Sequence, residues 1–293
     1  DIDQFDLARL EKRTNRALDL QQHNRLIQHL GTCALTYGCP AAKNYFLGRW
    51  EAPLPTSPQC NASCLGCISL PEDDRVCASQ ERITFVPSPE EIAEVAVGHL
   101  QEAEGPLVSF GQGCEGEPLL QGKTLKAAIK LIREQTGAGT INLNTNGSLP
   151  QTIAELRQTG LDSIRVSLNS TREDYYHAYY RPRGYSFADV IASLRAMKKG
   201  DGFVSINLLT LPGLTDEEEE VESIIRLIDD TGIDLIQMRN LNIDPEWYLQ
   251  GIGYSSSGRR LGTLQMMERI HQSHPQVKFG YFNPCLKPNK QSR

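Results

Sequence analysis

Along this 293-residue chain, apolar residues recur alternately with the spacing of strands and with the spacing of helices. This alternation restricts the fold more than any other feature of the sequence. From residue 83 onward, short apolar runs typical of strands alternate with longer runs whose apolar residues recur at helical spacing. The first such helix is predicted to begin at Ser88, which can cap its N-terminus. Pro89 suits the first helical position, and Glu91 can return a hydrogen bond to the cap. Repeated βα units of this kind predict a parallel sheet.

The pattern contains five or six βα units. The predicted strands lie at residues 107–110, 140–144, 163–168, 203–209, 234–239 and 277–281, and the predicted helices at 88–104, 125–136, 151–159, 187–199, 216–231 and 259–273. This number favours an α/β fold, a partial (β/α)6 TIM-like barrel whose site is formed by the loops after the strands. Residues 5–30 have an amphipathic helical pattern and predict an N-terminal helical extension.

The chain is therefore divided into three predicted regions. Residues 1–50 form the helical extension, residues 51–245 form the barrel core, and residues 246–293 supply a C-terminal helix, strand and tail that close the barrel. Chains of this length and apolar content can build one large α/β domain with a modest attachment.

Charge and hydropathy exclude several classes of function. The formal net charge is -6, whereas a nucleic-acid binder usually shows a basic domain or stripe, so a nucleic-acid partner is not expected. Apolar runs fall far short of the roughly 20 residues that span a bilayer, so no membrane partner is expected. The first segment is charged and polar, unlike a secretory signal. We expect a cytoplasmic protein.

Cysteine placement indicates a metal site. The chain has eight cysteines, of which Cys60, Cys64 and Cys67 lie within eight residues in a C-x3-C-x2-C run. The total is too small and too uneven for a disulfide scaffold in a chain of this size. Bunched thiolates favour iron or zinc ligation in a reducing compartment.

The C-x3-C-x2-C run resembles the cluster loop of the radical S-adenosylmethionine superfamily. In that family three thiolates bind three irons of a [4Fe-4S] cluster, and the fourth iron is left open for the amino and carboxylate groups of S-adenosylmethionine. Three cysteines in one loop can wrap one face of such a cluster, whereas ordinary clusters use four. Zinc is the alternative, and Cys39 or Cys77 could then supply a fourth ligand. The resemblance implies one cluster, bound by Cys60, Cys64 and Cys67.

A glycine-rich turn follows the predicted strand at 107–110. Its Gly-Glu-Pro-Leu-Leu ending resembles the "GGEP" turn of the same family, whose backbone and Glu hold the ammonium of the methionine part of the cofactor. The resemblance implies that Gly113, Gly116 and Glu117 bind S-adenosylmethionine. The turn departs from the compact family pattern by inserting Cys114 and Glu115, and Glu117 is the preferred carboxylate.

Later strand ends extend the resemblance. Asn146 lies in a Thr-Asn-Gly sequence similar to one found after the third strand of many members. Ser167 and Asn169 lie in a Ser-Leu-Asn sequence similar to the "SLD" segment that contacts the ribose, and Asn169 replaces the common Asp. The remaining cofactor candidates are Arg181 and Arg183 for the methionine carboxylate, and Asn207 and Gln237 near the adenine and the substrate.

The resemblance implies an enzyme that reductively cleaves S-adenosylmethionine to methionine and a 5'-deoxyadenosyl radical, which abstracts hydrogen from a substrate. The expected partners are a small-molecule or peptide substrate and a low-potential electron donor such as flavodoxin or ferredoxin. No catalytic residue is assigned. The alternatives are a non-catalytic iron-sulfur or zinc protein, such as a redox sensor or electron carrier, and an RNA-modifying methylase within the family.

Overall fold

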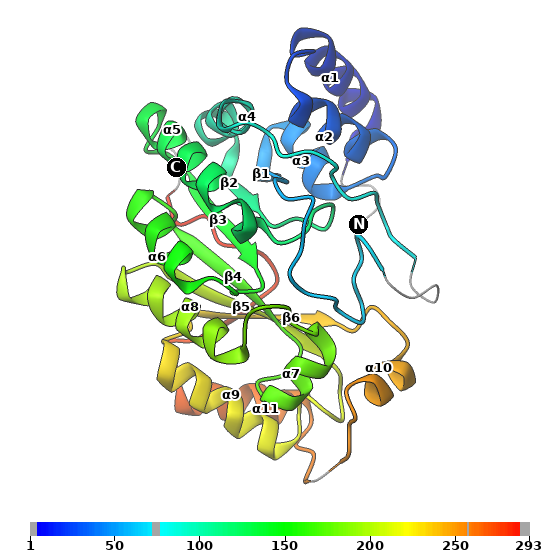
Figure 1. The fold of residues 1–293 in the computed structure, drawn as a ribbon, viewed down its shortest axis with the longest axis vertical. Helices are drawn as coiled ribbons and strands as arrows, with labels where there is room; N and C mark the ends of the chain where they lie inside the picture. The colour runs from blue at the N-terminus through cyan, green and yellow to red at the C-terminus, as the bar shows by residue number, and fades with distance from the viewer. Residues whose placement is uncertain (1–4, 72–76, 257, 288–293) are drawn as a thin grey trace.

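A curled sheet of seven parallel strands forms the centre of the molecule (Figure 1). The computed structural model describes residues 5–71, 77–256 and 258–287. Its strands follow one another in the sheet in sequence order, each paired in parallel with the next. They are β1 (Arg49–Pro53), β2 (Glu104–Phe110), β3 (Thr140–Thr145), β4 (Ser163–Leu168), β5 (Phe203–Thr210), β6 (Leu235–Asn240) and β7 (Lys278–Gly280). The predicted partial barrel is confirmed.

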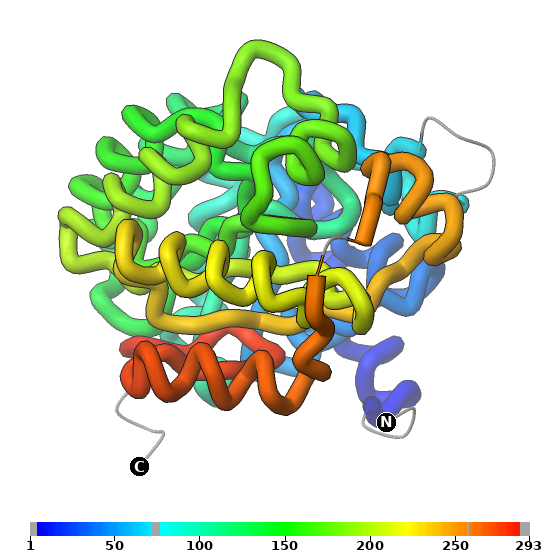
Figure 2. Tube along the Cα trace, turned by 90° about the horizontal axis from the view of Figure 1, so that it is seen from below, coloured from blue at the N-terminus to red at the C-terminus, as the bar shows by residue number. Residues whose placement is uncertain are grey.

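Helices cover the convex face of the sheet. Those that follow strands β1 to β6 are α4 (Pro89–Glu102), α5 (Gly122–Gln135), α6 (Pro150–Thr159), α7 (Glu173–Tyr180), α8 (Phe187–Lys199), α9 (Glu218–Thr231), α10 (Pro245–Gly251) and α11 (Thr263–Ser273), with a short 3-10 helix η2 (Pro118–Gln121) before α5. The predicted capping box of α4 is present, because the Ser88 side chain accepts from Glu91 and the Glu91 side chain accepts from the Ser88 N–H. Figures 1 and 2 show α5, α6, α8 and α9 side by side along the sheet.

The N-terminal extension differs from the single helical segment expected. It forms α1 (Leu7–Leu20), α2 (Arg25–Leu35) and α3 (Pro40–Leu47). The break before α2 arises because the Asn24 side chain accepts from Ile27 N at 3.1 Å and so begins a new helix. Strand β1, which follows α3, was not predicted. It has only β2 as a neighbour and contains few of the apolar residues that mark the other strands.

The C-terminal tail returns along the opposite end of the barrel from the loops that follow the strands. Leu286 N donates to the side-chain oxygen of Thr140, the first residue of β3, at 2.7 Å. The Cys285 thiol lies 3.5 Å from the carbonyl oxygen of Pro106, near the start of β2. The boundaries of the three predicted regions stay a prediction, and residues 1–4, 72–76, 257 and 288–293 of those regions lie outside the described residues.

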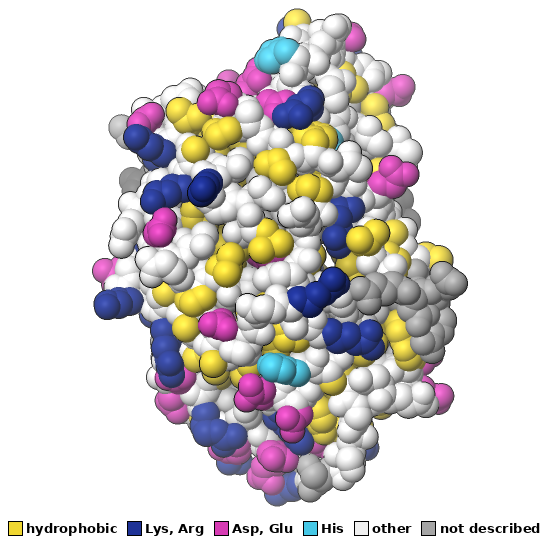
Figure 3. Space-filling model, in the orientation of Figure 1, with side chains coloured by type: hydrophobic (Ala, Val, Ile, Leu, Met, Phe, Trp, Pro, Cys, Tyr) yellow, Lys and Arg dark blue, Asp and Glu magenta, His cyan; other side chains and the backbone are white. Residues whose placement is uncertain are grey.

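Helix length and the distribution of surface charge bear on membrane and nucleic-acid binding. Within the described ranges, each helix is too short or too polar to cross a bilayer. On the face shown in Figure 3, basic and acidic side chains are interspersed. This face therefore offers no continuous basic track for a phosphate backbone.

Candidate active site

The three cysteines of the motif lie in one loop after β1, at the end of the barrel where the strands finish. Burial, together with the neighbouring thiols Cys60 and Cys67, raises the pKa of the Cys64 thiol. Metal binding would displace these protons, because the thiolate is the ligand. A zinc ion with Zn–S bonds of about 2.3 Å would hold its thiolates within about 4 Å of one another. The three thiols are not gathered within 4.8 Å, so this loop fits a larger iron-sulfur cluster better than one zinc ion.

Backbone hydrogen bonds fasten the cysteine loop to the C-terminal end of α7. Ser63 N donates to Tyr180 O at 3.0 Å, and Leu65 N donates to Tyr179 O at 3.0 Å. Tyr179 and Tyr180 are buried beside this loop, and an added Cβ on Gly66 would lie 2.8 Å from the Tyr179 hydroxyl. The Tyr-rich sequence therefore forms a helix that supports the cysteine loop and covers it with aromatic rings.

Arg82 was not identified from the sequence. One of its terminal nitrogens lies 3.6 Å from the Cys67 Sγ, and its Nε donates to the Ser69 hydroxyl at 3.1 Å. Leu70 N also donates to the Cys67 Sγ, at 3.4 Å. Such donors stabilise negative charge on a thiolate and tune the reduction potential of a cluster that it binds. No sequence motif marks Arg82, since it approaches Cys67 only when the loop folds back.

The glycine-rich turn after β2 packs directly against the cysteine loop. Gly116 N donates to Ser57 O at 2.6 Å, and Glu117 N donates to Gln59 O at 2.7 Å. A Cβ on Gly116 would lie 2.0 Å from Gln59 O, so a side chain cannot be placed there without moving backbone. Gly113 is also crowded, because its added Cβ would lie 2.7 Å from the Gln80 side chain.

Glu117 connects this turn to the end of β3. Its carboxylate accepts from Thr145 Oγ1 at 2.6 Å, from Asn146 N at 2.8 Å and from Leu119 N at 3.0 Å. Burial raises the pKa of Glu117 to about 7, and these donors act in the opposite direction. A carboxylate held in this way has a fixed position at the strand ends, with lone pairs left to accept from a ligand ammonium.

Glu115, which interrupts the family pattern, has a separate structural role. One carboxylate oxygen accepts from Gly111 N and Gln112 N at 2.7 and 2.8 Å. The other accepts from Thr56 N and Ser57 N at 2.8 and 3.0 Å. Burial raises the pKa of Glu115 to about 7, while the four N–H donors oppose that shift. Glu115 therefore joins the glycine-rich turn to the segment that leads into Cys60.

The structure brings several of the other predicted residues to the strand ends. Asn146 donates from its side chain to Asn61 Oδ1 in the cysteine loop at 2.8 Å. Ser167 lies on β4 opposite Asn207 on β5. Asn169 is fully buried, donates to Tyr175 O at 3.0 Å, and its Oδ1 is buried with no hydrogen-bond partner. That orphaned acceptor is the kind of atom that a ligand hydroxyl can satisfy.

The two arginines after α7 occupy different surroundings. Arg183 N donates to Asn61 O at 2.8 Å, and its guanidinium donates to the Ser63 hydroxyl, so it borders the cysteine loop. Arg181 caps α7 in a left-handed conformation and its side chain is exposed. Of the two, Arg183 is the one that the structure places against the loop.

The concave face of the sheet carries a connected set of polar side chains that sequence reasoning mostly missed. Apolar residues alternate with them and face the helices. Arg165 donates to Gln237 Oε1 at 3.0 Å, although the two residues lie on the non-adjacent strands β4 and β6. Arg239 donates to Asn207 Oδ1 at 3.1 Å. The i, i+2 alternation of polar residues in β3 and β4 was the available signal.

The C-terminal tail and β1 complete this polar interior. Asn283 accepts from Gln237 Nε2 at 3.0 Å and donates to Glu51 Oε1 at 2.9 Å. Burial lowers the pKa of Arg165 to about 10, and the carboxylate of Glu51 acts against that shift. Arg165 therefore stays protonated at neutral pH. The interior holds two guanidinium groups, those of Arg165 and Arg239, near one carboxylate.

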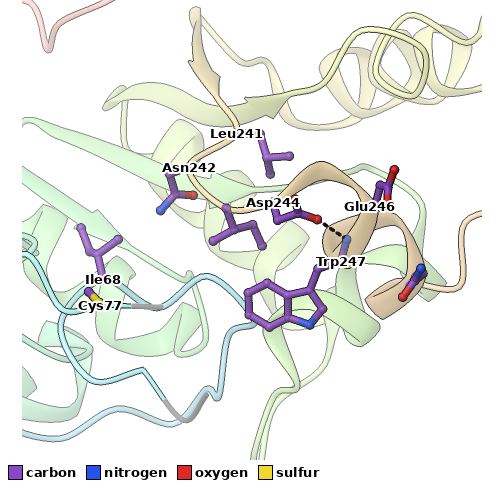
Figure 4. Close-up of a pocket in the computed structure, with 9 residues that line it drawn as sticks. Ile68, Cys77, Leu241, Asn242, Asp244, Glu246 and Trp247 are labelled. Carbon is purple, nitrogen blue, oxygen red and sulfur yellow. Dashed lines mark hydrogen bonds between the residues drawn. The ribbon is translucent and has the colours of Figure 1, made fainter. Parts of the chain in front are cut away.

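A cavity of about 660 Å³ opens beside the cysteine loop (Figure 4). It lies between Ile68, one residue after Cys67, and the segment that follows β6. In this segment the Asp244 side chain accepts from Trp247 N at 2.8 Å and begins α10. The cavity is in the range of small-molecule sites, and its lining mixes apolar and polar groups. The lining residues are Ile68, Cys77, Leu241, Asn242, Ile243, Asp244, Glu246, Trp247 and Gln250.

Comparison with known proteins identifies the family of the chain. The Radical SAM superfamily model matches residues 54–228. A probable GTP 3',8-cyclase from Methanocella arvoryzae is 28% identical over 173 residues, which cover 58% of this chain and 49% of that protein. The chain spans about half the length of this relative and of the similar GTP 3',8-cyclase from Marinobacter nauticus.

Solved structures share the fold. A radical SAM methyltransferase from Sphaerobacter thermophilus aligns with a TM-score of 0.55 and 16% identity, covering 80% of this chain and 66% of that one. Methylornithine synthase (PylB) aligns with a TM-score of 0.54 and 17% identity, covering 92% of this chain and 78% of that one.

The chain belongs to the radical S-adenosylmethionine superfamily. It is an enzyme of that family, and its cofactors are a [4Fe-4S] cluster and S-adenosylmethionine. The chemistry of the site agrees with this assignment, because three thiols share one loop, a buried carboxylate lies at the neighbouring turn, and a buried acceptor on Asn169 has no protein partner. The family assignment therefore favours the enzyme over the non-catalytic alternative.

Proposed function

We propose that this enzyme removes hydrogen from a substrate that carries an anionic group, a carboxylate or a phosphate, bound on the concave face of the sheet. Cys60, Cys64 and Cys67 would hold the cluster. When bound, the cluster supplies the electron that cleaves S-adenosylmethionine into methionine and the 5'-deoxyadenosyl radical. Every other requirement, namely binding, orientation and exclusion of water, falls to side chains of this chain.

The cofactor is proposed to lie across the ends of β2 to β6. Gly113, Gly116 and Glu117 would receive its ammonium group, and Arg183 or Arg181 its carboxylate. Asn146, Ser167 and Asn169 would contact the ribose, and Asn207 and Gln237 the adenine side. The carboxylate of Glu117 is buried and is held by three hydrogen-bond donors, which supports its assignment to the ammonium group of the cofactor.

The observation that carries the substrate proposal is the pair of arginines on the concave face. Arg165 and Arg239 come from different strands and both contact the side chain of Gln237, at 3.0 and 3.5 Å. Glu51 is the carboxylate that acts on Arg165, so the arginines leave an excess of positive charge in this interior. A guanidinium binds a carboxylate or a phosphate through two parallel hydrogen bonds. An anionic substrate group would balance this charge.

The same interior supports orientation of the reacting carbon. Hydrogen abstraction depends strongly on distance, so the substrate must be fixed close to the 5' carbon of the cofactor. Side chains that are already hydrogen-bonded to one another, such as Arg165 to Gln237, lose little conformational freedom when a ligand binds. Tyr176 and Tyr180, both buried near Cys64, would keep water from the radical.

The substrate is proposed to be a small molecule or a peptide whose anionic group reaches Arg165. The cavity beside Ile68 and Trp247 could admit the remainder of either. We also propose a low-potential donor such as flavodoxin or ferredoxin, and a cytoplasmic location. All eight cysteines are unpaired thiols, which supports a reducing compartment.

Substrate-dependent formation of 5'-deoxyadenosine tests the proposal. The reconstituted enzyme would be screened with three sets of compounds: small carboxylic acids, phosphate esters, and peptides with free and amidated C-termini. A true substrate should accelerate 5'-deoxyadenosine release, and Arg165→Gln should remove this acceleration while slow release without substrate persists. Arg195→Gln is the matched control, because Arg195 lies outside the barrel and pairs with Asp230. If only neutral or cationic compounds accelerate release, the anionic proposal is wrong.

A further inference from the structure

A second group of potential metal ligands lies away from the cysteine motif. His29, Cys33 and Cys114 each present a ligand atom, and all three atoms lie within 4.8 Å of one another. His29 and Cys33 are four residues apart on α2, so they share one face of the helix, and His29 Nε2 lies 3.5 Å from Cys33 Sγ. Cys114 reaches the same point from the glycine-rich turn after β2. Neither the proposed cluster nor the proposed cofactor contacts use these residues.

A fourth thiol lies near Cys33 and Cys114. Cys39, the residue before α3, lines a cavity of about 30 Å³ together with Cys33 and Cys114. Cys39 N donates to Cys33 O at 2.9 Å, so the backbone between the two cysteines is held in place. The Cys33 and Cys114 side chains are buried, at 2% and 5% exposure. This cavity exceeds the roughly 10–15 Å³ that one water molecule needs, so it has room for a single small ion.

The donor set identifies the kind of ion. Three thiols and one imidazole are soft to borderline ligands, which favour zinc over the hard cations that bind oxygen. One histidine with three cysteines is a known ligand set of tetrahedral structural zinc sites, which leave no position open for substrate. The close grouping of the His29, Cys33 and Cys114 ligand atoms also suits one ion, in contrast to the wider spacing of Cys60, Cys64 and Cys67.

We propose that His29, Cys33, Cys39 and Cys114 bind one structural zinc ion. The ion would join the N-terminal helices to the turn that carries Glu115 and Glu117. Two regions far apart in sequence would then be fixed at one point: the α2–α3 segment and the loop after β2. Zinc would therefore order the cofactor-binding turn without taking part in the reaction.

Metal analysis of the full chain tests this proposal. The protein would be purified anaerobically from zinc-supplemented cells, and zinc and iron would be measured by mass spectrometry. About one zinc per chain is expected. The same amount is expected in the combined Cys60→Ala, Cys64→Ala and Cys67→Ala variant, which should lack iron.

Single replacements then locate the ion. Cys33→Ser and Cys114→Ser should each lose most of the zinc, whereas Cys285→Ser, a half-buried thiol near the start of β2, should retain it. Replacement of zinc by Co²⁺ in the wild-type chain should give thiolate-to-cobalt absorption and the visible bands of a tetrahedral site. This measurement does not depend on whether the serine variants fold.

Four results would overturn the proposal. The first is a wild-type chain with far less than one zinc. The second is loss of zinc in the variant that lacks the motif cysteines, which would place the ion in that motif. The third is iron in place of zinc in that variant. The fourth is a Cys33–Cys114 disulfide in the anaerobic protein, detected by peptide mapping. Because these results concern metal content, they are independent of the substrate proposal.

Discussion

Replacing Gly116 with alanine should separate the cysteine loop from the cofactor-binding turn. The added Cβ would lie 2.0 Å from Gln59 O, 2.4 Å from Gln59 C and 3.1 Å from Cys60 N. Ordinary van der Waals contact needs a separation larger by more than 1 Å, and the obstructing atoms are backbone, which cannot rotate away. The two segments must therefore move apart next to Cys60.

The expected cost follows from the contacts that this movement breaks. The hydrogen bonds from Gly116 N to Ser57 O, at 2.6 Å, and from Glu117 N to Gln59 O, at 2.7 Å, would both be lengthened beyond a useful distance. Each is worth about 0.5–1.5 kcal/mol, and overpacking adds about 1–3 kcal/mol. We expect Gly116→Ala to lower the free energy of unfolding by about 2–6 kcal/mol.

Urea unfolding of the wild type and Gly116→Ala, under anaerobic conditions and with iron retention measured in parallel, checks this prediction. Gly137→Ala is the matched control, because its Cβ would meet no atom within 4 Å and its backbone is not left-handed. The control should unfold within about 0.5 kcal/mol of the wild type. If Gly116→Ala behaves like Gly137→Ala and keeps its iron, the close approach of turn and loop is not important for the site.

Two further predictions concern charge. Arg82→Gln removes a charged donor 3.6 Å from Cys67 Sγ, so the reduction potential of the cluster should fall. The expected decrease is about 40–90 mV, the equivalent of about 1–2 kcal/mol for one electron. An unchanged potential in a spectroscopic redox titration would contradict this role of Arg82. Burial lowers the pKa of His99 from 6.5 to about 4, and the ring lies 2.6 Å from Trp50 O. The stabilising contribution of neutral His99 is therefore complete above pH 6.5 and is lost as the pH falls towards 4, by up to about 3 kcal/mol. Urea unfolding from pH 7.5 to 4.5 should show a shallower decline for His99→Gln than for the wild type, and equal declines would refute the assignment.

Much of the barrel could be predicted because local patterns and tertiary packing agree. Strands β2 to β6 each carry buried apolar residues, and α4 carries a complete capping box. Strand β1 was missed because a short edge strand with Trp50 and Glu51 lacks that apolar signal. Helix α7 was missed because its tyrosines pack around the cysteine loop, a contact that no local pattern encodes.

The candidate site, like the fold, could be predicted only in part from the sequence. The cysteine motif and the Gly-Glu-Pro turn are contiguous in sequence, and both could be located there. The roles of Glu115 and Arg82 depend on loops that meet only in the folded chain, at Thr56 and Cys67. The link between Arg165 and Gln237 depends on the curl of the sheet, because the two residues lie on non-adjacent strands. Residue spacing alone carries no information about such contacts.

Electron paramagnetic resonance of the reconstituted, dithionite-reduced protein, with and without S-adenosylmethionine, tests the central claim most directly. The wild type should show a [4Fe-4S] signal that changes when the cofactor is added, together with slow release of 5'-deoxyadenosine. Cys64→Ala should lose both the signal and the release, whereas Cys77→Ala should keep them. A cluster whose signal is indifferent to S-adenosylmethionine, or a Cys64→Ala variant that still cleaves it, would contradict the assignment of Cys60, Cys64 and Cys67 as the cluster ligands.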